Sequence, residues 1–316
     1  MTQPIIPEIP ARLIEAELTP ERFLRNTNKG GNQLYVFDAA SCPQTMREVG
    51  RLREIAFRAG GGGTGTECDI DEFDLMDPPC MQLVVWDPES KRILGGYRFI
   101  CGRDIRFDRP GVPRLATGHL FSFSEDFVEN YLPYTIELGR SFVRIESQAT
   151  GHAAGGKAIY VLDNLWDGLG ALSVINPEIR YFFGKVTMYP SYLSECRDMI
   201  LHFYHKYFPD PDCLVTPINP LRPVSESSDI ERMFCGGDFR EDYKILNKAI
   251  RDHGLSIPPL VNSYMNLSPT MRCFGTAVNT EFGDVEETGI LVTIDDIFDT
   301  KKQRHIDTYR ENLSQS

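Results

Sequence analysis

The run IELGRSFVRIESQATGHAAGGK, at residues 136–157, constrains the fold of this chain more than any other stretch. Its first half alternates apolar side chains with charged and small ones, which is the period-two pattern of a β-strand. Its second half is rich in glycine and alanine and leads into the helical pattern KAIYVLDNLWDGLGALSVI. The sequence therefore predicts a strand, a small-residue loop and a helix in direct succession.

Two charged residues of this strand need an explanation. Side chains alternate between the two faces of a regular strand, which would place Glu137 and Arg140 on opposite faces. A β-bulge would change that arrangement, and Gly139 marks the position where a bulge is expected. The charges indicate either a functional cleft at this strand or an ion pair, and the residues leave both open.

The loop after the strand has the composition of an anion-binding loop. Small residues let backbone N–H groups approach a phosphate closely, and the dipole of the following helix favours the anion. An ordinary glycine-rich turn between a strand and a helix would have the same composition. The residues with the expected phosphate-binding role are Gln148, Gly151, Ala153, Gly155 and Gly156.

Helical and strand patterns alternate along the rest of the chain. The segment 44–60 repeats apolar residues at helical spacing, and its other face carries arginines that include Arg53. Such mixed alternation predicts an α/β fold, in which helices cover both faces of a mixed central sheet. Strands are predicted at residues 34–39, 81–87, 92–100, 135–143, 179–188, 270–278 and 288–294, and helices at 44–60, 157–175, 192–208 and 239–254.

Composition argues against several classes of protein. The formal charge of −12 argues against a nucleic-acid binder, because phosphate contacts need a basic surface. The eight cysteines form no CxxC pair, so we expect free thiols and no metal site. We see no apolar run of membrane-spanning length and no signal peptide, which predicts a cytoplasmic location.

An acidic motif, DIDEFD at residues 69–74, follows the glycine-rich break after the first predicted helix. Taken alone, it is also typical of a solvated turn. The order Asp71-x-Phe73-Asp74, then GGYR, then ELGR and the small-residue loop resembles the GNAT superfamily of acyltransferases. More narrowly, it resembles the branch of acyl-homoserine-lactone synthases and bacterial ornithine- and glycine-lipid N-acyltransferases, some of which are called hemolysin-like.

Three further motifs extend the resemblance to the lipid-synthesis members of this branch. They are LWDG at 165–168, YFFGKVTM at 181–188 and PPL-x-x-x-Y-x-x-L at 258–267. The resemblance implies three parts of the chain: an N-terminal arm at 1–31, a GNAT-like acyltransferase core at 32–215, and a C-terminal part at 216–316 that completes the sheet and the acyl cleft.

The resemblance implies an enzyme that transfers a fatty acyl group to the amine of an amino acid in lipid synthesis. The donor would be a thioester of acyl carrier protein or of coenzyme A, used as a co-substrate, with no tightly bound cofactor. Amide formation needs a proton acceptor, and Glu137, a carboxylate on the central strand, is the first candidate. An ion pair with Arg98 or Arg140 explains Glu137 equally well.

Other site residues are carried over from the family motifs. Arg98 and Arg140 resemble arginines that organise the site together with Asp71 and Asp74. An arginine would also suit the carboxylate of an amino-acid acceptor, through a planar, bidentate contact. The resemblance further implies that backbone N–H groups at the end of the strand polarise the thioester carbonyl. Those groups belong to Ser141, Phe142 and Val143.

The partners follow from the same resemblance. An acidic carrier protein would need a local basic patch on this chain. The arginines that could supply it are Arg47, Arg51, Arg58, Arg103, Arg106, Arg109 and Arg114. A peripheral membrane contact and the oligomeric state stay open.

Two other functions also stay open. One is an autoinducer synthase of the acyl-homoserine-lactone type, and the long C-terminal third argues against it because those synthases resemble only the shorter core. The other is a non-catalytic GNAT-like module that binds acyl groups or proteins. Glu137 and Arg140 would be dispensable in such a module.

Overall fold

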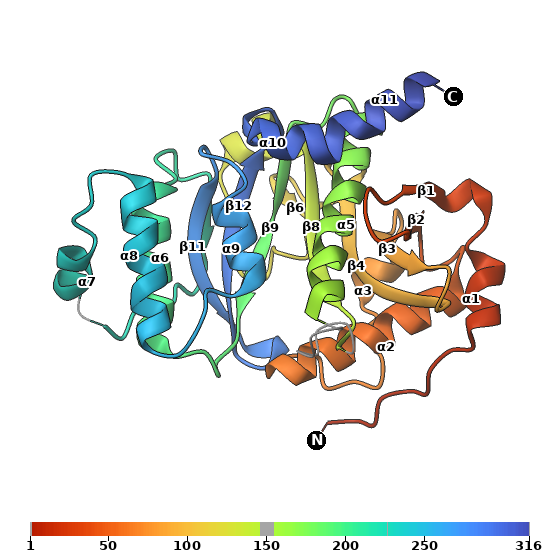
Figure 1. The fold of residues 1–316 in the computed structure, drawn as a ribbon, viewed down its shortest axis with the longest axis horizontal. Helices are drawn as coiled ribbons and strands as arrows, with labels where there is room; N and C mark the ends of the chain where they lie inside the picture. Colours follow the sequence, from red (N-terminus) through yellow and green to blue (C-terminus); the bar gives the residue numbers. More distant parts are fainter. Residues whose placement is uncertain (1, 146–154, 226, 316) are drawn as a thin grey trace. The chain divides into compact units, whose positions relative to one another are not determined.

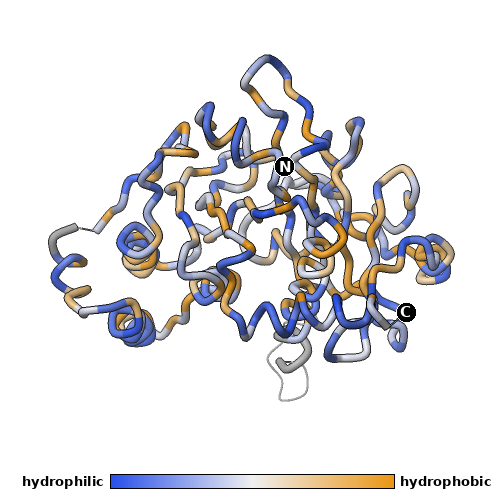
Figure 2. Tube along the Cα trace, turned by 90° about the horizontal axis from the view of Figure 1, so that it is seen from above, coloured by the Kyte–Doolittle hydropathy of each residue, from blue (hydrophilic) through white to orange (hydrophobic). Residues whose placement is uncertain are grey.

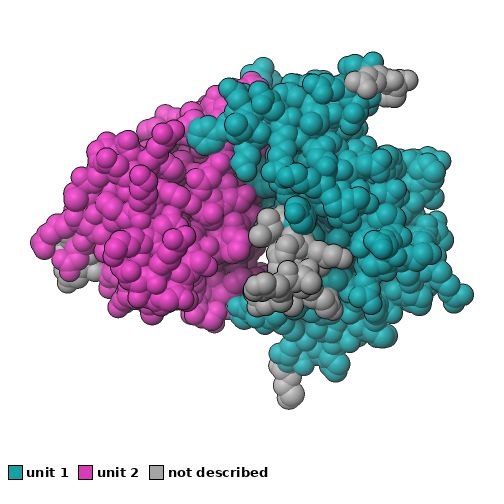
Figure 3. Space-filling view, viewed as in Figure 1, with its two compact units in different colours: residues 1–106, 133–180, 298–316 teal, residues 107–132, 181–297 magenta. Residues whose placement is uncertain are grey.

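A computed structural model describes residues 2–145, 155–225 and 227–315. They form two compact units whose segments interleave along the chain (Figure 3). Unit 1 comprises residues 1–106, 133–180 and 298–316, and unit 2 comprises residues 107–132 and 181–297. The division expected from the sequence, with boundaries after residues 31 and 215, follows the chain order and stays a prediction.

The strands of unit 1 form an antiparallel sheet in the order β1-β2-β3-β4-β8 (Figure 1). Valine, isoleucine and aromatic residues favour the extended backbone of these segments. The strand β1 comes from the N-terminal arm, so part of the arm belongs to this sheet. The strands are β1 (Phe23–Asn26), β2 (Gln33–Phe37), β3 (Met81–Asp87), β4 (Arg92–Cys101) and β8 (Thr135–Val143).

The helices of unit 1 are α1 (Ala11–Glu17), α2 (Pro43–Gly60), α3 (Glu72–Leu75), α5 (Gly155–Ile175), α10 (Asp299–Lys302) and α11 (Thr308–Gln315), with the helical turns η1 (Pro20–Arg22), η2 (Gly102–Asp104) and η7 (Gln303–Asp307). Gln82 of β3 accepts a hydrogen bond from Arg53 of α2. The next strand residue, Leu83, lies against α5, where a Cβ on Gly168 would come within 2.6 Å of it. Because successive strand residues point to opposite faces, α2 and α5 cover opposite faces of the sheet.

A β-bulge interrupts β8 next to Gly139, where the sequence predicts one. Arg98 of β4 pairs with Gly139 whereas Gly96 pairs with Phe142, so β8 has one more residue than β4 in this interval. Arg140, rather than Gly139, adopts the left-handed conformation, with φ of +49°. That conformation is uncommon and strained for any residue with a Cβ. The predicted bulge is confirmed, and its strained residue is an arginine of the predicted site.

Unit 2 contains three antiparallel strands, in the order β9-β12-β11. Figure 2 shows its helices with hydrophilic and hydrophobic residues on different sides, as expected of helices that cover a core. The strands are β9 (Tyr181–Met188), β11 (Arg272–Asn279) and β12 (Val285–Thr293), with two-stranded ribbons of β5 (Phe107–Arg109) with β6 (Val112–Pro113) and of β7 (Phe121–Phe123) with β10 (Val215–Pro217). The helices are α6 (Ser194–Tyr207), α7 (Ser227–Met233), α8 (Phe239–Asp252) and α9 (Pro259–Met265), with the turns η3 (Phe127–Tyr131), η5 (Thr280–Phe282) and η6 (Ile294–Asp296).

The predicted α/β fold class, with helices flanking a sheet, is confirmed. All eight cysteines are free thiols, as the lack of paired spacing indicates. Within the described ranges, we find no helix that is both long enough and apolar enough to cross a bilayer.

The LWDG motif ties both ends of unit 1 to α5. Asp167 is fully buried and accepts hydrogen bonds from the backbone and side-chain nitrogens of Asn28, at 2.8 and 2.7 Å. It also contacts Nδ1 of His305 in η7, at 2.7 Å. The backbone of η7 lies so close to α5 that a Cβ on Gly170 would meet the carbonyl oxygen of His305 at 2.2 Å. The N-terminal and C-terminal segments therefore pack on one helix.

Replacing Gly170 by alanine should test this close approach. The added methyl group must push η7 away from α5, and overpacking of this kind costs about 1–3 kcal/mol. We expect the free energy of unfolding, measured by urea denaturation, to fall by that amount. A matched Gly237→Ala variant, whose Cβ would lie 3.7 Å from the nearest atom, should change it by less than about 0.5 kcal/mol. Equal stability of the two variants would contradict the packing described.

Candidate active site

The acidic motif folds into a capped turn rather than a solvated loop. Asp71 is the N-cap of α3, and its carboxylate accepts hydrogen bonds from the backbone N–H groups of Phe73 and Asp74, at 2.9 and 3.3 Å. The carboxylate of Asp74 in turn accepts a hydrogen bond from the N–H group of Asp71, at 3.1 Å. This reciprocal capping box fixes both carboxylates relative to the backbone.

Arg53 of α2 contacts the capped turn from the face of the sheet that α2 covers. Its side chain is fully buried, and its Nη1 lies 3.2 Å from a carboxylate oxygen of Asp74. Gln82 of β3 completes the arrangement, because its side-chain oxygen accepts a hydrogen bond from Arg53 and its Nε2 donates one to Asp74 at 2.9 Å. The buried guanidinium therefore joins α2, β3 and the acidic turn.

Arg98 of β4 reaches the same turn from the sheet. Its Nη1 lies 2.6 Å from Asp71 and 3.4 Å from Asp74. The guanidinium also lies over the ring of Phe73, 5.5 Å from its centre, an arrangement that favours a cation. Both aspartates of the D-x-F-D order thus bind one arginine of the GGYR motif.

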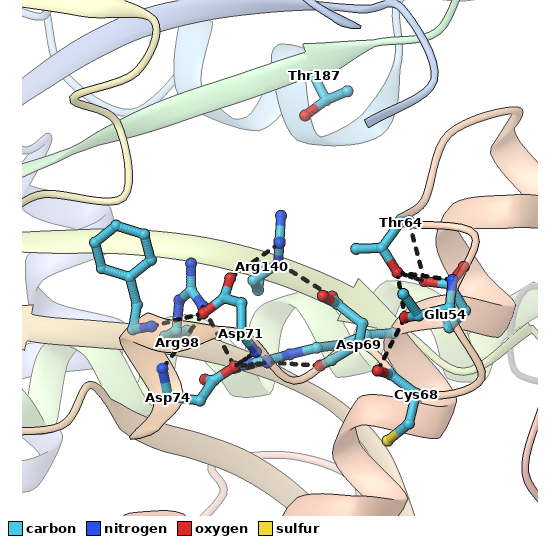
Figure 4. Close-up of polar contacts among 12 residues, drawn as sticks. Glu54, Thr64, Cys68, Asp69, Asp71, Asp74, Arg98, Arg140 and Thr187 are labelled. Atoms are coloured by element: carbon cyan, nitrogen blue, oxygen red, sulfur yellow. Dashed lines mark hydrogen bonds and ion pairs between the residues drawn. The ribbon is translucent and has the colours of Figure 1, made fainter. Parts of the chain in front are cut away.

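Arg140, the residue at the bulge of β8, holds two aspartates at once (Figure 4). Its Nη2 donates a hydrogen bond to Asp71 at 3.1 Å, and its Nε lies 3.1 Å from a carboxylate oxygen of Asp69. We call this assembly the arginine–aspartate cluster. Its members are Arg53, Arg98 and Arg140 with Asp69, Asp71 and Asp74, together with Gln82.

Glu137 is buried on the face of β8 that carries the cluster. Its side chain shares a face with Gly139, the partner of Arg98, because these strand residues are two apart. Burial raises the pKa of the nearby Cys80 thiol to about 12, although the positive charge of Arg98 opposes the rise and the negative charge of Glu137 adds to it. Arg98 and Glu137 share this face through the regular pairing of β4 with β8, and the bulge turns Arg140 to the same face. The role of Glu137 as a base stays a prediction.

The surroundings shift the pKa values of the two carboxyl groups that contact Arg140 in opposite directions. Burial opposes the ionisation of Asp71, but Arg98 and Arg140 outweigh it and hold the pKa of this carboxyl well below its usual range. For Asp69, burial dominates and raises the pKa above its usual range, although Arg140, Arg53 and Arg98 pull it down. Burial would also lower the pKa of Arg98, but Asp74 and Asp71 outweigh it and raise that pKa.

The residues expected to bind the acyl donor lie at and beyond the end of β8. Ser141, Phe142 and Val143 are its last three residues, and the latter two pair with Gly96 and Gly95 of β4. The close approach requires glycine, since a Cβ on Gly95 would lie 2.7 Å from the carbonyl oxygen of Phe142.

Only part of the predicted phosphate loop is described. Gln148, Gly151 and Ala153 lie outside the described residues. Gly155 and Gly156 are the first residues of α5. Donor binding by these residues stays a prediction. Among the side chains that are described, no group of three histidine, cysteine, aspartate or glutamate residues is placed to hold a metal ion.

Known proteins are similar to this sequence over most of its length. Residues 52–154, a range that includes all six charged residues of the cluster, match the acetyltransferase (GNAT) domain family. The chain is 58% identical over 308 residues to a glycine N(alpha)-acyltransferase of Bacteroides thetaiotaomicron, covering 98% of this chain and 91% of the relative. The chain belongs to the GNAT N-acyltransferases.

A second relative is similar to this chain at nearly the same level of identity. The glycine N(alpha)-acyltransferase of Phocaeicola vulgatus is 56% identical over 305 residues, covering 96% of this chain and 93% of the relative. Among solved structures, a coenzyme A-dependent acyl-homoserine lactone synthase is 10% identical over 90% of each chain, with a TM-score of 0.35. That likeness is too distant to bear on any residue of the site.

Three members of the cluster do not follow from the family motifs. Arg53 was expected on the polar face of its helix, and that expectation is wrong, because its side chain is fully buried against Asp74. Gln82 carries no signal in the sequence beyond a polar residue in an apolar strand. Asp69 had a weak signal, because it precedes Asp71 by two residues in the DIDEFD motif.

The buried pair of Arg53 with Asp74 gives a prediction about stability. Replacing Asp74 by alanine leaves the Arg53 guanidinium buried without its counter-ion, which costs about 3–5 kcal/mol. We expect the free energy of unfolding of Asp74→Ala, measured by urea denaturation, to fall by that amount. Asp77→Ala is the control, because Asp77 is 94% exposed and pairs with an exposed arginine, and it should lose less than about 0.5 kcal/mol. A small loss in Asp74→Ala would refute the role given to this pair.

The low pKa of Asp71 gives a prediction about pH. As the pH falls below about 4, an unfolded aspartate takes up a proton while the folded Asp71 stays ionised, so folding loses stability down to the folded pKa. This contribution is largest above pH 4 and falls by up to about 1.4 kcal/mol per pH unit below it. We expect Asp71→Asn to lose less stability than the unmodified chain between pH 5 and pH 3 in denaturant titrations. Identical slopes would show that Arg98 and Arg140 do not hold Asp71 ionised.

Proposed function

We propose that this acyltransferase transfers a fatty acyl group from a thioester to the α-amine of glycine, as a step of lipid synthesis in the cytoplasm. The observation that carries the proposal is the identity of 58% and 56%, over nearly the whole chain, with two relatives named glycine N(alpha)-acyltransferase. The charges of the cluster support an acceptor that brings its own carboxylate. Glycine offers a carboxylate and an amine and has no side chain.

Arg140 is the arginine that suits the carboxylate of glycine. Its side chain is 15% exposed, compared with 5% for Arg98 and none for Arg53. A guanidinium can bind a carboxylate through two parallel hydrogen bonds, which fixes both the position and the orientation of the acceptor. We infer that Arg53 and Arg98 hold the aspartates while Arg140 meets the substrate.

The reaction needs one proton transfer and one stabilised oxyanion. The amine nitrogen attacks the thioester carbonyl carbon, the C–N bond forms, and the C–S bond then breaks to release the thiolate. In our proposal Glu137 accepts the proton of the amine and returns it to the leaving thiolate. Backbone N–H groups of Ser141, Phe142 and Val143 would donate hydrogen bonds to the carbonyl oxygen as it gains negative charge.

The donor is either acyl carrier protein or acyl-coenzyme A. The arginines expected to form a patch for the acidic carrier protein are partly neutralised. Arg51 pairs with Glu48 at 2.8 Å, and Arg58 pairs with Glu54 at 2.7 Å. The positive charge that these arginines leave available is smaller than the sequence suggests, so neither donor is favoured.

Purified protein incubated with glycine and a fatty acyl thioester should yield N-acylglycine and the free thiol, both measured by mass spectrometry. Separate reactions with acyl carrier protein and with coenzyme A thioesters identify the donor. Glu137→Gln should lower kcat by about 10²–10⁴-fold because it removes the proton acceptor. Glu311→Gln, which changes an exposed residue of α11, is the matched control and should retain full activity. Intact thioesters and no product from folded protein would refute the proposed reaction, and a fully active Glu137→Gln would refute the base.

A further inference from the structure

The carboxylate of Asp69 is buried with few stabilising contacts. Its side chain is fully buried, and within the described ranges neither carboxylate oxygen accepts a hydrogen bond. The Nε of Arg140, at 3.1 Å, is close enough for an ion pair but is not aligned as a hydrogen-bond donor. A buried carboxylate without hydrogen bonds is costly to the folded state. Its presence therefore calls for a specific role.

The backbone, rather than the side chain, holds Asp69 in place. The N–H group of Asp69 donates a hydrogen bond to the carbonyl oxygen of Gly50 in α2, at 3.1 Å. Its carbonyl oxygen accepts one from Nη1 of Arg53 at 3.4 Å. The segment lies so close to α2 that a Cβ on Gly50 would meet Sγ of Cys68 at 2.6 Å. The carboxylate of Asp69 therefore stands at a fixed point beside Arg140.

Arg140 needs support from more than one side. Its backbone has the left-handed conformation, which costs about 1–3 kcal/mol for a residue with a Cβ unless the surroundings stabilise it. Its long side chain has several rotatable bonds, and fixing them also costs free energy. Asp71 holds the guanidinium at Nη2, and Asp69 lies at Nε (Figure 4). Two contacts on different nitrogens fix the plane of the guanidinium, which one contact alone would leave free to turn.

We propose that Asp69 is a positioning residue, which fixes Arg140 through its Nε edge so that the guanidinium is oriented for the carboxylate of the amino-acid acceptor. This inference rests on the proposed function for the identity of the acceptor. Asp69 acts through Arg140 and does not touch the substrate, because its own side chain has no exposed surface. Orientation matters because a bidentate contact with a carboxylate requires the two planes to match.

The charge of Asp69 supports the same role. The charged groups that face it are Arg53 from α2, Arg98 from β4 and Arg140 from β8, together with Asp71. The thiol of Cys68 also lies nearby, and burial, followed by Asp69, raises its pKa to about 11. Burial raises the pKa of Asp69 itself, so this carboxyl binds a proton more readily than an exposed aspartate does. Three guanidinium groups thus face one buried carboxyl group, and Arg140 is the one whose side chain is 15% exposed.

Kinetics with two acceptors test the proposal. Glycine carries the carboxylate and glycinamide lacks it, so the ratio of their kcat/KM values measures recognition of the carboxylate. Asp69→Ala should raise the KM for glycine at least about 10-fold, reduce the preference for glycine over glycinamide, and change the KM for the acyl thioester less than about 2-fold. Asp69→Asn keeps an oxygen beside Nε and should stay within about 3-fold of the unmodified enzyme. Asp77→Asn, at an exposed aspartate, is the matched control and should behave as the unmodified enzyme does.

A double-variant cycle separates positioning from general destabilisation. If Asp69 acts through Arg140, Asp69→Ala combined with Arg140→Ala should be no worse than Arg140→Ala alone, within about 2-fold. Multiplied losses, or an unchanged preference for glycine in folded Asp69→Ala, would overturn the proposal. Asp69→Ser, too short to reach Nε, replaces the alanine variant if that one does not fold.

A crystal structure of Asp69→Ala, or of Asp69→Ser, tests the positioning without any substrate. We expect the guanidinium of Arg140 to leave the position it has beside Asp71. An unchanged Arg140 would overturn the proposal even if glycine is acylated. A displaced Arg140 in a protein that acylates no amino acid would instead support the positioning and refute the proposed function, so the two failures are distinguishable.

Discussion

A single buried guanidinium, that of Arg53, determines the arrangement of the whole site. Because it has no contact with solvent, its charge must be compensated inside the protein, and Asp74 lies 3.2 Å away. Asp74 also closes the capping box of the acidic turn and contacts Arg98. Helix α2, the acidic turn, β3 and β4 are thereby fixed at one point. A buried ion pair of this kind adds little net stability, but the register it imposes is costly to break.

The bulge of β8 adds to this cluster a side chain that can contact a substrate. In a regular strand Arg140 would point away from Glu137, and the acidic turn would have no partner on β8. The extra residue at the bulge turns Arg140 towards Asp69 and Asp71 and leaves 15% of its side chain exposed. The strain of its left-handed backbone is offset by these two contacts. Stability and chemistry therefore depend on the same residue.

Much of this arrangement could be predicted from the order of motifs. The sequence indicates the strand at 135–143, the bulge next to Gly139, and an acidic turn that binds the arginines of GGYR and ELGR. Arg53 could not be predicted, because in a helix with several arginines nothing local marks the one that is buried. Asp69 and Asp71 look alike in the sequence, yet their pKa values shift in opposite directions. That difference depends on how burial and the charges of the surrounding arginines balance at each carboxyl group.

The sequence by itself determined most of the elements, the α/β class, the position of the acidic motif and the set of charges available to the site. Those properties follow from local patterns: apolar periodicity, small residues and short motifs. Only the tertiary structure decided which arginine of α2 is buried, which face Arg140 takes, and which carboxylate accepts no hydrogen bond from the described residues. These depend on the approach of segments far apart in the chain, such as Gly50 against residues 68–70 and β4 against β8. Electrostatic energies change steeply with burial and distance, so the pairing of charges is settled only when those segments pack.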